Sequence, residues 1–158
     1  MIWKVLTYRL IYLNIILFFA FAIGTYFYNW LAPFAGILLI NIFDMYGYDF
    51  VLRNHWKGIQ PGEEIVTAYR IIQKSFEGLV ILFLFVLFDW RAAVGCFLLI
   101  MFTVQDLIYY FFLQYPLPKR FTWIRWSPIG FIIGDVPTWL VIVQGVIGII
   151  IIIGVNYL

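Results

Sequence analysis

The sequence predicts an all-α protein, a polytopic membrane helix bundle of five transmembrane helices with a cytoplasmic N-terminus and an external C-terminus. Three observations predict it. Of the 158 residues, 65% are hydrophobic and only 11% are charged, with a mean hydropathy of +1.00, which is typical of proteins embedded in lipid. Long apolar runs alternate with short polar stretches, and basic residues gather in alternate stretches. Residues 1–158 are therefore expected to form a single integral-membrane domain in the cytoplasmic membrane or its equivalent.

The first two predicted spans, about 10–28 and 31–52, are joined by a minimal connection at Asn29-Trp30. The N-terminal flank is basic, as in a signal peptide. However, residues 11–28 are too aromatic and lack a convincing small-residue cleavage site. We therefore expect the first helix to be retained.

The third predicted span, about 72–89, follows an amphipathic cytoplasmic extension over 61–74. Within this extension, charged residues recur in steps of four and three, beside an apolar stripe that includes Tyr69. The apolar residues after Glu77 alone are too few to cross a bilayer, so the helix has to include earlier residues. One long helix is expected to begin near Pro61.

The fourth predicted span covers about 92–113, and the fifth covers 128/136–156. Ser127 before Pro128 is typical of a helix N-cap followed by proline at the first helical position. Two interpretations of the fifth span are open. Either a kinked helix starts at Pro128 with Asp135 lining the bundle, or Asp135 caps a helix that begins near Val136, which we prefer.

The distribution of basic residues sets the orientation. Every Lys and Arg except Arg91 falls before the first span, between the second and third, or between the fourth and fifth. Lys and Arg accumulate on the cytoplasmic side of membrane proteins. This bias predicts the cytoplasmic N-terminus and the external C-terminus.

Three acidic residues, Asp44, Glu77 and Asp106, interrupt three of the predicted spans. Each lies about 13 residues, or about 20 Å, from the external end of its span, so all three share one depth in the cytoplasmic half. An ionisable residue inside a membrane is a candidate functional group. For Glu77 the alternative is a position in the first turn of a helix capped by Ser75.

Polar neighbours accompany two of these acids. Asn41, Asp44 and Tyr48 form one polar stripe on an apolar helix, which we expect to face inward. Asp106 has neighbours that can hydrogen bond with it: Gln105, Tyr109 and Tyr110. The alternative for both acids is a polar clamp between helices. Asp49 is expected to be a solvated charge at the cytoplasmic boundary.

Acids clustered in a low dielectric have to share protons, bind a cation or pair with a base. We therefore favour an enzyme that performs acid–base chemistry, such as double-bond isomerisation or cyclisation, on a lipid or isoprenoid. The candidate catalytic residues are Asp44, Glu77 and Asp106. The candidate substrate-binding residues are Asn41, Tyr48, Arg53, Arg70, Gln105, Tyr109, Tyr110 and Asp135.

A metal-assisted form of this chemistry would hold Mg²⁺ or Mn²⁺ between Asp44, Glu77 and Asp106, and would act on a lipid phosphate with Arg53 or Arg70 as the anion clamp. The sequence has a single Cys and a single His, so no haem, iron–sulfur cluster or structural zinc is expected.

Two alternatives belong to other functional classes. A proton or cation transporter or channel subunit would relay charge through Asp49 and His55, although the predicted outer half offers little beyond Thr103 and Gln144. A non-catalytic assembly or scaffold subunit would use its acids and small residues, such as Gly145, only to lock helices together. The expected partners are membrane lipids, and further copies of the chain or another membrane protein are candidate partners. Nucleic acid is not expected, because the basic residues are scattered.

Overall fold

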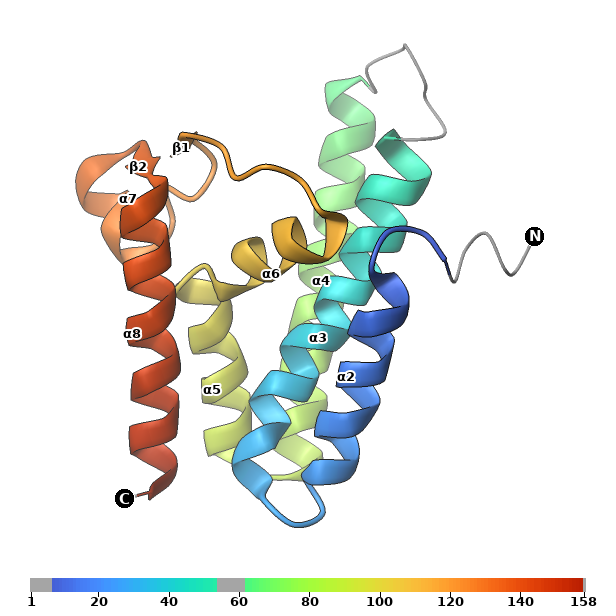
Figure 1. Cartoon of the computed structure of the whole chain (residues 1–158), viewed down its shortest axis with the longest axis vertical. Helices are drawn as coiled ribbons and strands as arrows, with labels where there is room; N and C mark the ends of the chain where they lie inside the picture. Colours follow the sequence, from blue (N-terminus) through green and yellow to red (C-terminus); the bar gives the residue numbers. More distant parts are fainter. Residues whose placement is uncertain (1–6, 54–61, 158) are drawn as a thin grey trace.

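The computed structural model describes residues 7–53 and 62–157, which form a bundle of helices (Figure 1). In chain order the elements are α2 (Ile11–Gly24), η1 (Asn29–Leu31), α3 (Ala32–Asp44), η2 (Met45–Arg53), α4 (Glu63–Leu87), α5 (Trp90–Met101), α6 (Val104–Leu113), β1 (Arg120–Phe121), α7 (Pro128–Ile133), β2 (Val136–Pro137) and α8 (Thr138–Tyr157). The predicted all-α class is confirmed, since each strand has only two residues.

The helices α2 and α3 form an antiparallel hairpin whose connection contains the short 3-10 helix η1 (Figure 1). Pro33 lies in the first turn of α3, where its missing N–H has no intrahelical partner to lose. The prediction of a short link between the first two helices is therefore confirmed. The helix α2 has 14 residues and is shorter than the predicted span.

The helix α3 continues directly into the π-helix η2, and with η1 before them they contain the apolar stretch Asn29–Val51 of 23 residues. The wider π-helical turn changes which side chains face the bundle, and such turns are frequent at functional sites. The side chain of Asp49, within η2, is fully buried. The prediction of a solvated charge at this position is therefore wrong.

The helix α4 is one continuous helix of 25 residues. It begins at Glu63, directly after Gly62, so the predicted extension and the third predicted span do form a single helix. Pro61, the predicted starting point, lies outside the described residues. Asp89 then caps α5 by accepting a hydrogen bond from the Ala92 N–H at 2.9 Å, which turns the chain sharply back along the bundle.

The fourth predicted span, 92–113, is not one continuous helix, because the chain bends by 68° between α5 and α6. Thr103 lies at the bend with a φ of 63°, a left-handed conformation that ends α5. Its hydroxyl donates to the Phe102 carbonyl at 2.6 Å and accepts from Gln144 Nε2 of α8 at 3.2 Å. A Cβ on Gly148 would stand 2.6 Å from the Phe102 Cβ, so glycine permits this close approach of α8.

The start of the fifth predicted span is only partly as expected. Ser127 caps α7 by accepting a hydrogen bond from the Gly130 N–H at 3.1 Å, with Pro128 at the first helical position, as predicted. However, Gly134 ends α7 with a φ of 79°, and β1 then pairs with β2 before α8 begins. Asp135 therefore neither lines a kinked helix nor caps α8, because a strand separates it from Thr138.

The exterior of the bundle is strongly apolar. Two stretches, Asn29–Val51 and Thr138–Val155, are long and apolar enough to cross a membrane, and α5 with α6 makes a third if the bent pair counts as one span. Large apolar side chains point outward, including Phe19 of α2, Phe83 of α4 and Ile150 of α8. A surface of this kind suits contact with lipid, so the chain has the character of a membrane protein with two to three helices of spanning length.

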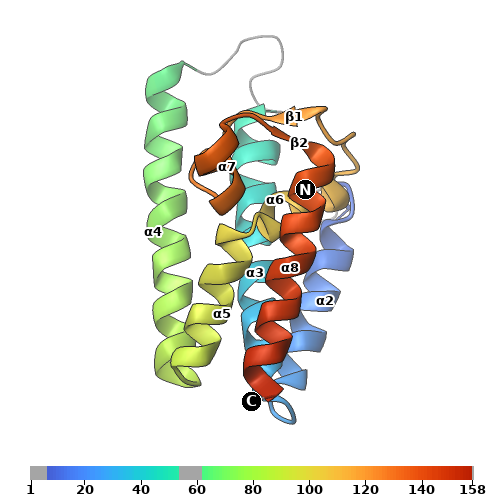
Figure 2. The ribbon, with the colours of Figure 1, turned by 90° about the vertical axis from the view of Figure 1, so that its left-hand side faces the viewer.

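The helix α3 occupies the middle of the bundle, where α2, α4, α5 and α6 all pack against it (Figures 1 and 2). The largest apolar cluster joins α3, α4, α5 and α8 through residues such as Ile37, Val80, Leu99 and Ile152. Polar side chains carried by α3 are therefore enclosed by neighbouring helices, which sets the position of the candidate site.

Candidate functional site

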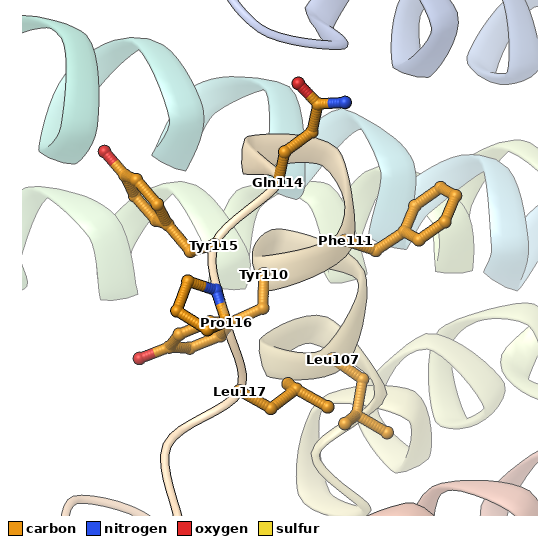
Figure 3. Close-up of a pocket in the computed structure, with 7 residues that line it drawn as sticks. All are labelled: Leu107, Tyr110, Phe111, Gln114, Tyr115, Pro116 and Leu117. Carbon is orange, nitrogen blue, oxygen red and sulfur yellow. The ribbon is translucent and has the colours of Figure 1, made fainter.

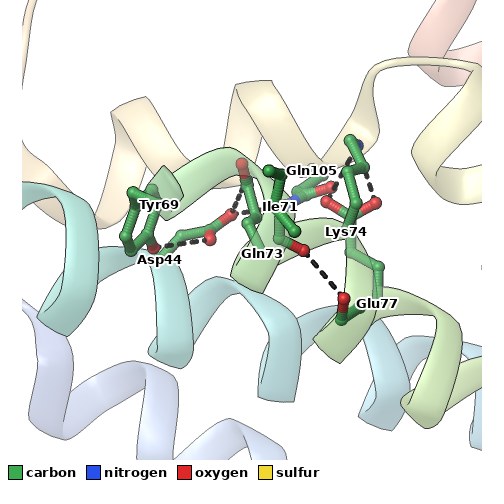
Figure 4. Close-up of polar contacts among 8 residues, drawn as sticks. Asp44, Tyr69, Ile71, Gln73, Lys74, Glu77 and Gln105 are labelled. Carbon is green, nitrogen blue, oxygen red and sulfur yellow. Dashed lines mark hydrogen bonds and ion pairs between the residues drawn. The ribbon is translucent and has the colours of Figure 1, made fainter. Parts of the chain in front are cut away.

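Asp44, near the end of α3, is the centre of a buried hydrogen-bond network (Figure 4). Its Oδ1 accepts from the Tyr69 hydroxyl at 3.2 Å, and its Oδ2 accepts from Gln73 Nε2 at 2.9 Å, both on α4. Gln105 Nε2 of α6 donates to the same Oδ2 at 2.5 Å. The side chain is 4% exposed, so this carboxyl group joins three helices away from solvent.

Glu77 lies one turn after Gln73 on α4, and Lys74 on the same helix pairs with it. The Lys74 Nζ lies 2.7 Å from Glu77 Oε2 and 3.0 Å from Oε1 (Figure 4). Lys74 is mostly exposed while Glu77 is buried, so the long side chain brings its charge to a carboxylate in the interior. The Lys74 Nζ also lies 5.5 Å from the centre of the Trp126 ring, a cation–π distance.

Asp106, in the first turn of α6, is half-buried. It accepts a hydrogen bond from Trp123 Nε1 at 2.9 Å. The Trp123 ring stacks on Tyr110, with ring centres 6.2 Å apart and an angle of 15° between the planes. One side of this carboxyl group is therefore an aromatic wall contributed by α6 and the loop before α7.

Glu77 links the three acids electrostatically, although they lie on three different helices. The charge of Glu77 acts on the carboxyl groups of both Asp44 and Asp106, and the Lys74 charge acts on Asp106. Gln105 and Asp106 are consecutive, so α6 contacts Asp44 through Gln105 and contributes the next side chain, Asp106, as the third acid. We call Asp44, Glu77 and Asp106 the acidic region. The bend before α6 sets the position of Asp106 near the other two acids. The predicted depth of Asp106, counted in residues along one straight helix, does not explain this position.

Some of the other predicted substrate-binding residues lie near the partners of the three acids, and others do not. Tyr48 lies beside Tyr69, with ring centres 5.6 Å apart, and Tyr109 contacts Tyr110 edge to face. Arg70 is exposed on α4, and Asp135 forms an ion pair with Arg125 at 3.1 Å. The structure does not bring either to the three acids. The side chain of Arg53, like residue His55, lies outside what the structure describes.

Asn41 belongs to a second polar contact, which does not include Asp44. Its Nδ2 lies 3.5 Å from the Met45 sulfur, and Asn14 Nδ2 of α2 lies 3.7 Å from the same atom. Both asparagines are fully buried, and the two amide oxygens have no hydrogen-bond partner in the described structure. Two members of the predicted polar stripe therefore have different partners: Asn41 contacts Met45, which Asn14 of α2 also contacts, and Asp44 contacts α4 and α6.

Sequence reasoning missed two residues that hold Asp44. Tyr69 was assigned to an apolar stripe, and Gln73 received no role. Tyr69, Gln73 and Glu77 are spaced four residues apart and therefore share one face of α4. This spacing was a usable signal. Trp123 was missed as well, and its loop has no periodicity that could have indicated its position.

Asp49 has its own enclosed environment at the end of the bundle where α2 begins. The Tyr8 hydroxyl donates to its Oδ2, and the Tyr115 hydroxyl lies 3.1 Å from its Oδ1. Arg9 stacks above the Tyr115 ring at 5.2 Å. This arrangement ties η2 to the chain before α2 and after α6, away from the three acids.

The two polar groups predicted for the outer half contact each other. Gln144 donates to the Thr103 hydroxyl through Nε2 and accepts from the Ile129 N–H at 2.9 Å through Oε1. All three positions are on elements around the bend. The geometry therefore gives these two side chains a structural role at the bend.

No three His, Cys, Asp or Glu side chains among residues 7–53 and 62–157 are arranged so that they could hold a metal ion. The proposed ligands Asp44, Glu77 and Asp106 are held instead by amide, phenol, ammonium and indole donors. This geometry does not support the metal-assisted form of the hypothesis.

A pocket of about 550 Å³ lies beside α6 and the segment that follows it (Figure 3). It is lined by Leu107, Tyr110, Phe111, Gln114, Tyr115, Pro116 and Leu117. These residues belong to α6 and the segment that follows it, and Tyr110 contributes to both the pocket and the wall beside Asp106. The pocket therefore borders the acidic region without including an acid.

Comparison with protein-family models, curated proteins and solved structures finds no match to this chain.

Proposed function

We propose that the chain crosses the cytoplasmic membrane five times, with its N-terminus in the cytoplasm and its C-terminus outside. The long helices alternate in direction, and the α2–α3 and α4–α5 connections lie at the same end of the bundle (Figure 1). Arg91 lies at this end, and all other Lys and Arg residues fall in segments assigned to the opposite side. This separation supports the orientation, because positive residues favour the cytoplasmic side.

We propose further that the protein is an enzyme that performs acid–base chemistry on a lipid or isoprenoid. One observation carries the proposal: Asp106 accepts a hydrogen bond from Trp123, and the Lys74 ammonium that pairs with Glu77 lies over the Trp126 ring. Two carboxyl groups in different surroundings can serve as acid and base in one reaction. Aromatic faces can stabilise a positive charge that develops on a substrate carbon.

The contacts support one assignment of roles. Glu77 is paired with the Lys74 ammonium, which favours the carboxylate form and suits it to act as the base. Asp106 is half-buried beside Trp123 and acts as the acid. In an isomerisation, Asp106 gives its proton to one alkene carbon and leaves a carbocation. Glu77 then removes a proton from a neighbouring carbon, so the double bond moves without net oxidation or reduction.

Asp44 is a positioning residue in this proposal. Its oxygens accept hydrogen bonds from Tyr69, Gln73 and Gln105, so they are occupied by the protein itself. Gln105 is adjacent to Asp106 in the sequence, and its bond to Asp44 fixes the start of α6. Asp44 thereby holds Asp106 at a defined place relative to α4.

The test uses the full chain in lipid nanodiscs with a farnesyl-chain alcohol as the probe, in D₂O. A proton that passes through Asp106 comes from solvent, so the isomerised product should carry deuterium on carbon, which mass spectrometry detects. We expect Asp106→Asn and Glu77→Gln each to lower this incorporation by about a hundredfold or more. Glu64→Gln is the matched control, because it removes a charge from exposed α4 surface and should leave the rate unchanged.

If no solvent deuterium enters the probe or the nanodisc lipids, the enzymatic proposal is wrong. It is equally wrong if Asp106→Asn keeps the full rate.

The scaffold function is the second candidate, and the network around Asp44 favours it. A carboxyl group whose oxygens are engaged by two helices is the geometry of a polar clamp. A scaffold subunit should co-purify with a membrane partner in a complex that Asp44→Asn dissociates. The same substitution would alter no chemical conversion. Failure to recover such a complex from mildly solubilised membranes would count against this function.

A further inference from the structure

We infer that an apolar groove between α2, α3 and α4 holds the hydrocarbon tail of the lipid-like substrate. The groove has a volume of about 250 Å³. It is lined by Phe18, Ala22, Thr25, Ala35, Gly36, Leu39, Val80, Phe83, Leu84, Leu87 and Phe88. The inference rests on the proposed function for the identity of the ligand, and it adds the place where the ligand's tail lies.

The chemistry of the walls selects a hydrocarbon. Thr25 is the one lining residue with a polar side chain, and its hydroxyl donates to the Ala22 carbonyl at 2.5 Å. That hydrogen bond satisfies the hydroxyl within α2, so it leaves the walls without a donor directed at a ligand. A polar group placed in the groove would lose its hydrogen bonds, whereas a methylene chain loses none.

Small residues form the floor and large ones form the rim. Ala35 and Gly36 of α3 lie at the floor, where a Cβ on Gly36 would stand 2.7 Å from Leu84 Cδ1. Phe83 and Leu87 of α4 line the groove and are 61% and 70% exposed. The groove is therefore open along the apolar exterior, and a chain can enter it sideways from the bilayer.

One end of the groove adjoins the acidic region. Val80 and Leu84 follow Glu77 at three and seven residues on one face of α4, and the first step is a rise of about 4.5 Å. The Glu77 charge also acts on Cys96, whose sulfur would be 3.1 Å from a Cβ on Gly36. A ligand with its reactive end at Glu77 can thus extend its tail over Val80 toward Leu84.

The tail gains little from leaving water, because it moves from lipid into an equally apolar groove. Its position depends on van der Waals fit and on the reactive end held among the acids. Filling the groove should therefore displace the tail, whereas placing an aromatic ring elsewhere on the lipid-facing surface should not.

The test measures occupancy without turnover. The probe is a farnesyl-chain alcohol that carries a diazirine near the far end of its tail, bound to the full chain in nanodiscs and photolysed. Adducts are mapped by mass spectrometry on Val80–Phe88, and adducts on Ile147–Ile151 of α8 report nonspecific contact with lipid. We expect the α4 segment to be labelled about tenfold more than the α8 segment.

The groove-filling variant is Ala22→Phe, and the matched control is Ile23→Phe, which adds an aromatic ring at the adjacent exposed position. Ala22→Phe should lower labelling of the α4 segment about tenfold, because overpacking excludes the tail. Ile23→Phe should leave it unchanged. Equal labelling of α4 and α8, or equal labelling in both variants, would overturn the inference.

The outcomes also separate this inference from the proposed function. Groove labelling without solvent deuterium in any product supports the groove and refutes the acid–base activity. Full deuterium incorporation in Ala22→Phe, with labelling of the α4 segment equal to that of α8 in the unmodified chain, refutes the groove and supports the activity.

Discussion

Asp44 and Asp106 lie near the same Glu77 charge, yet their surroundings differ. Asp44 is almost fully buried and accepts hydrogen bonds from residues of α4 and α6. Asp106 is half-buried, and its described hydrogen bond comes from Trp123 in a loop. The difference teaches that an acid inside a bundle can either hold helices together or stay accessible. Which of the two applies depends on how many hydrogen-bond donors the surrounding helices supply.

The largest expected difference concerns stability. Asp44→Ala leaves the donors of Tyr69, Gln73 and Gln105 without their acceptor, so we expect a loss of about 2 kcal/mol in the free energy of unfolding. Asp106→Ala should cost about 0.5 kcal/mol. Denaturant unfolding of both variants in the same detergent measures the two values, and equal losses would remove the distinction.

Chemical access should separate the two acids next. Dicyclohexylcarbodiimide adds to neutral carboxyl groups that it can reach within a membrane. We expect Asp106 to be modified about tenfold faster than Asp44, because modification of Asp44 requires the helices to open locally. Peptide mass spectrometry over a time course gives both rates. Faster modification of Asp44 would show that its carboxyl group is more accessible than that of Asp106.

Removing one donor from each acid should give a smaller contrast. Gln105→Leu deletes the bond from α6 to Asp44 and should cost about 1 kcal/mol of stability. Trp123→Phe keeps an aromatic ring near Tyr110 but removes the indole N–H, and should cost about 0.5 kcal/mol. Thermal unfolding in nanodiscs compares them. If Trp123→Phe is more destabilising than Gln105→Leu, the proposed difference between Asp44 and Asp106 is not supported.

The smallest effect is expected at the exposed edge. Trp126→Leu removes the ring beside the Lys74 ammonium while preserving apolar bulk, and should cost no more than about 0.5 kcal/mol. The Lys74–Glu77 ion pair remains in this variant. A loss of unfolding free energy as large as that of Asp44→Ala would mean that the aromatic side of the site also holds the helices together.

Helix content, the α2–α3 hairpin, the single long α4 and the Ser127 cap could all be predicted from the sequence. Each depends on a local pattern: an apolar run, a charge spacing, or a capping residue before proline. The inward direction of Asp44 could also be predicted, because a lone acid on an apolar helix face has to avoid lipid.

The bend at Thr103 and the partners of Asp106 could not be predicted. A threonine in an apolar run carries no local signal for a left-handed backbone, and here that conformation coincides with contacts from Gln144 and the close approach at Gly148. Trp123 reaches Asp106 only because β1 pairs with β2 and fixes the loop between them. Such long-range contacts override what local periodicity indicates.

The hydrogen bond from Gln144 to Thr103 has a consequence for biosynthesis, because the two residues are 41 positions apart. A nascent chain that ends before α8 contains the whole apolar segment 90–113 but not the group that holds its bend. We expect such a truncated product to insert 90–113 as one uninterrupted span, and cysteine accessibility mapping of the arrested chain measures this. Gln105 would then reach Asp44 only after the last helix has been synthesised.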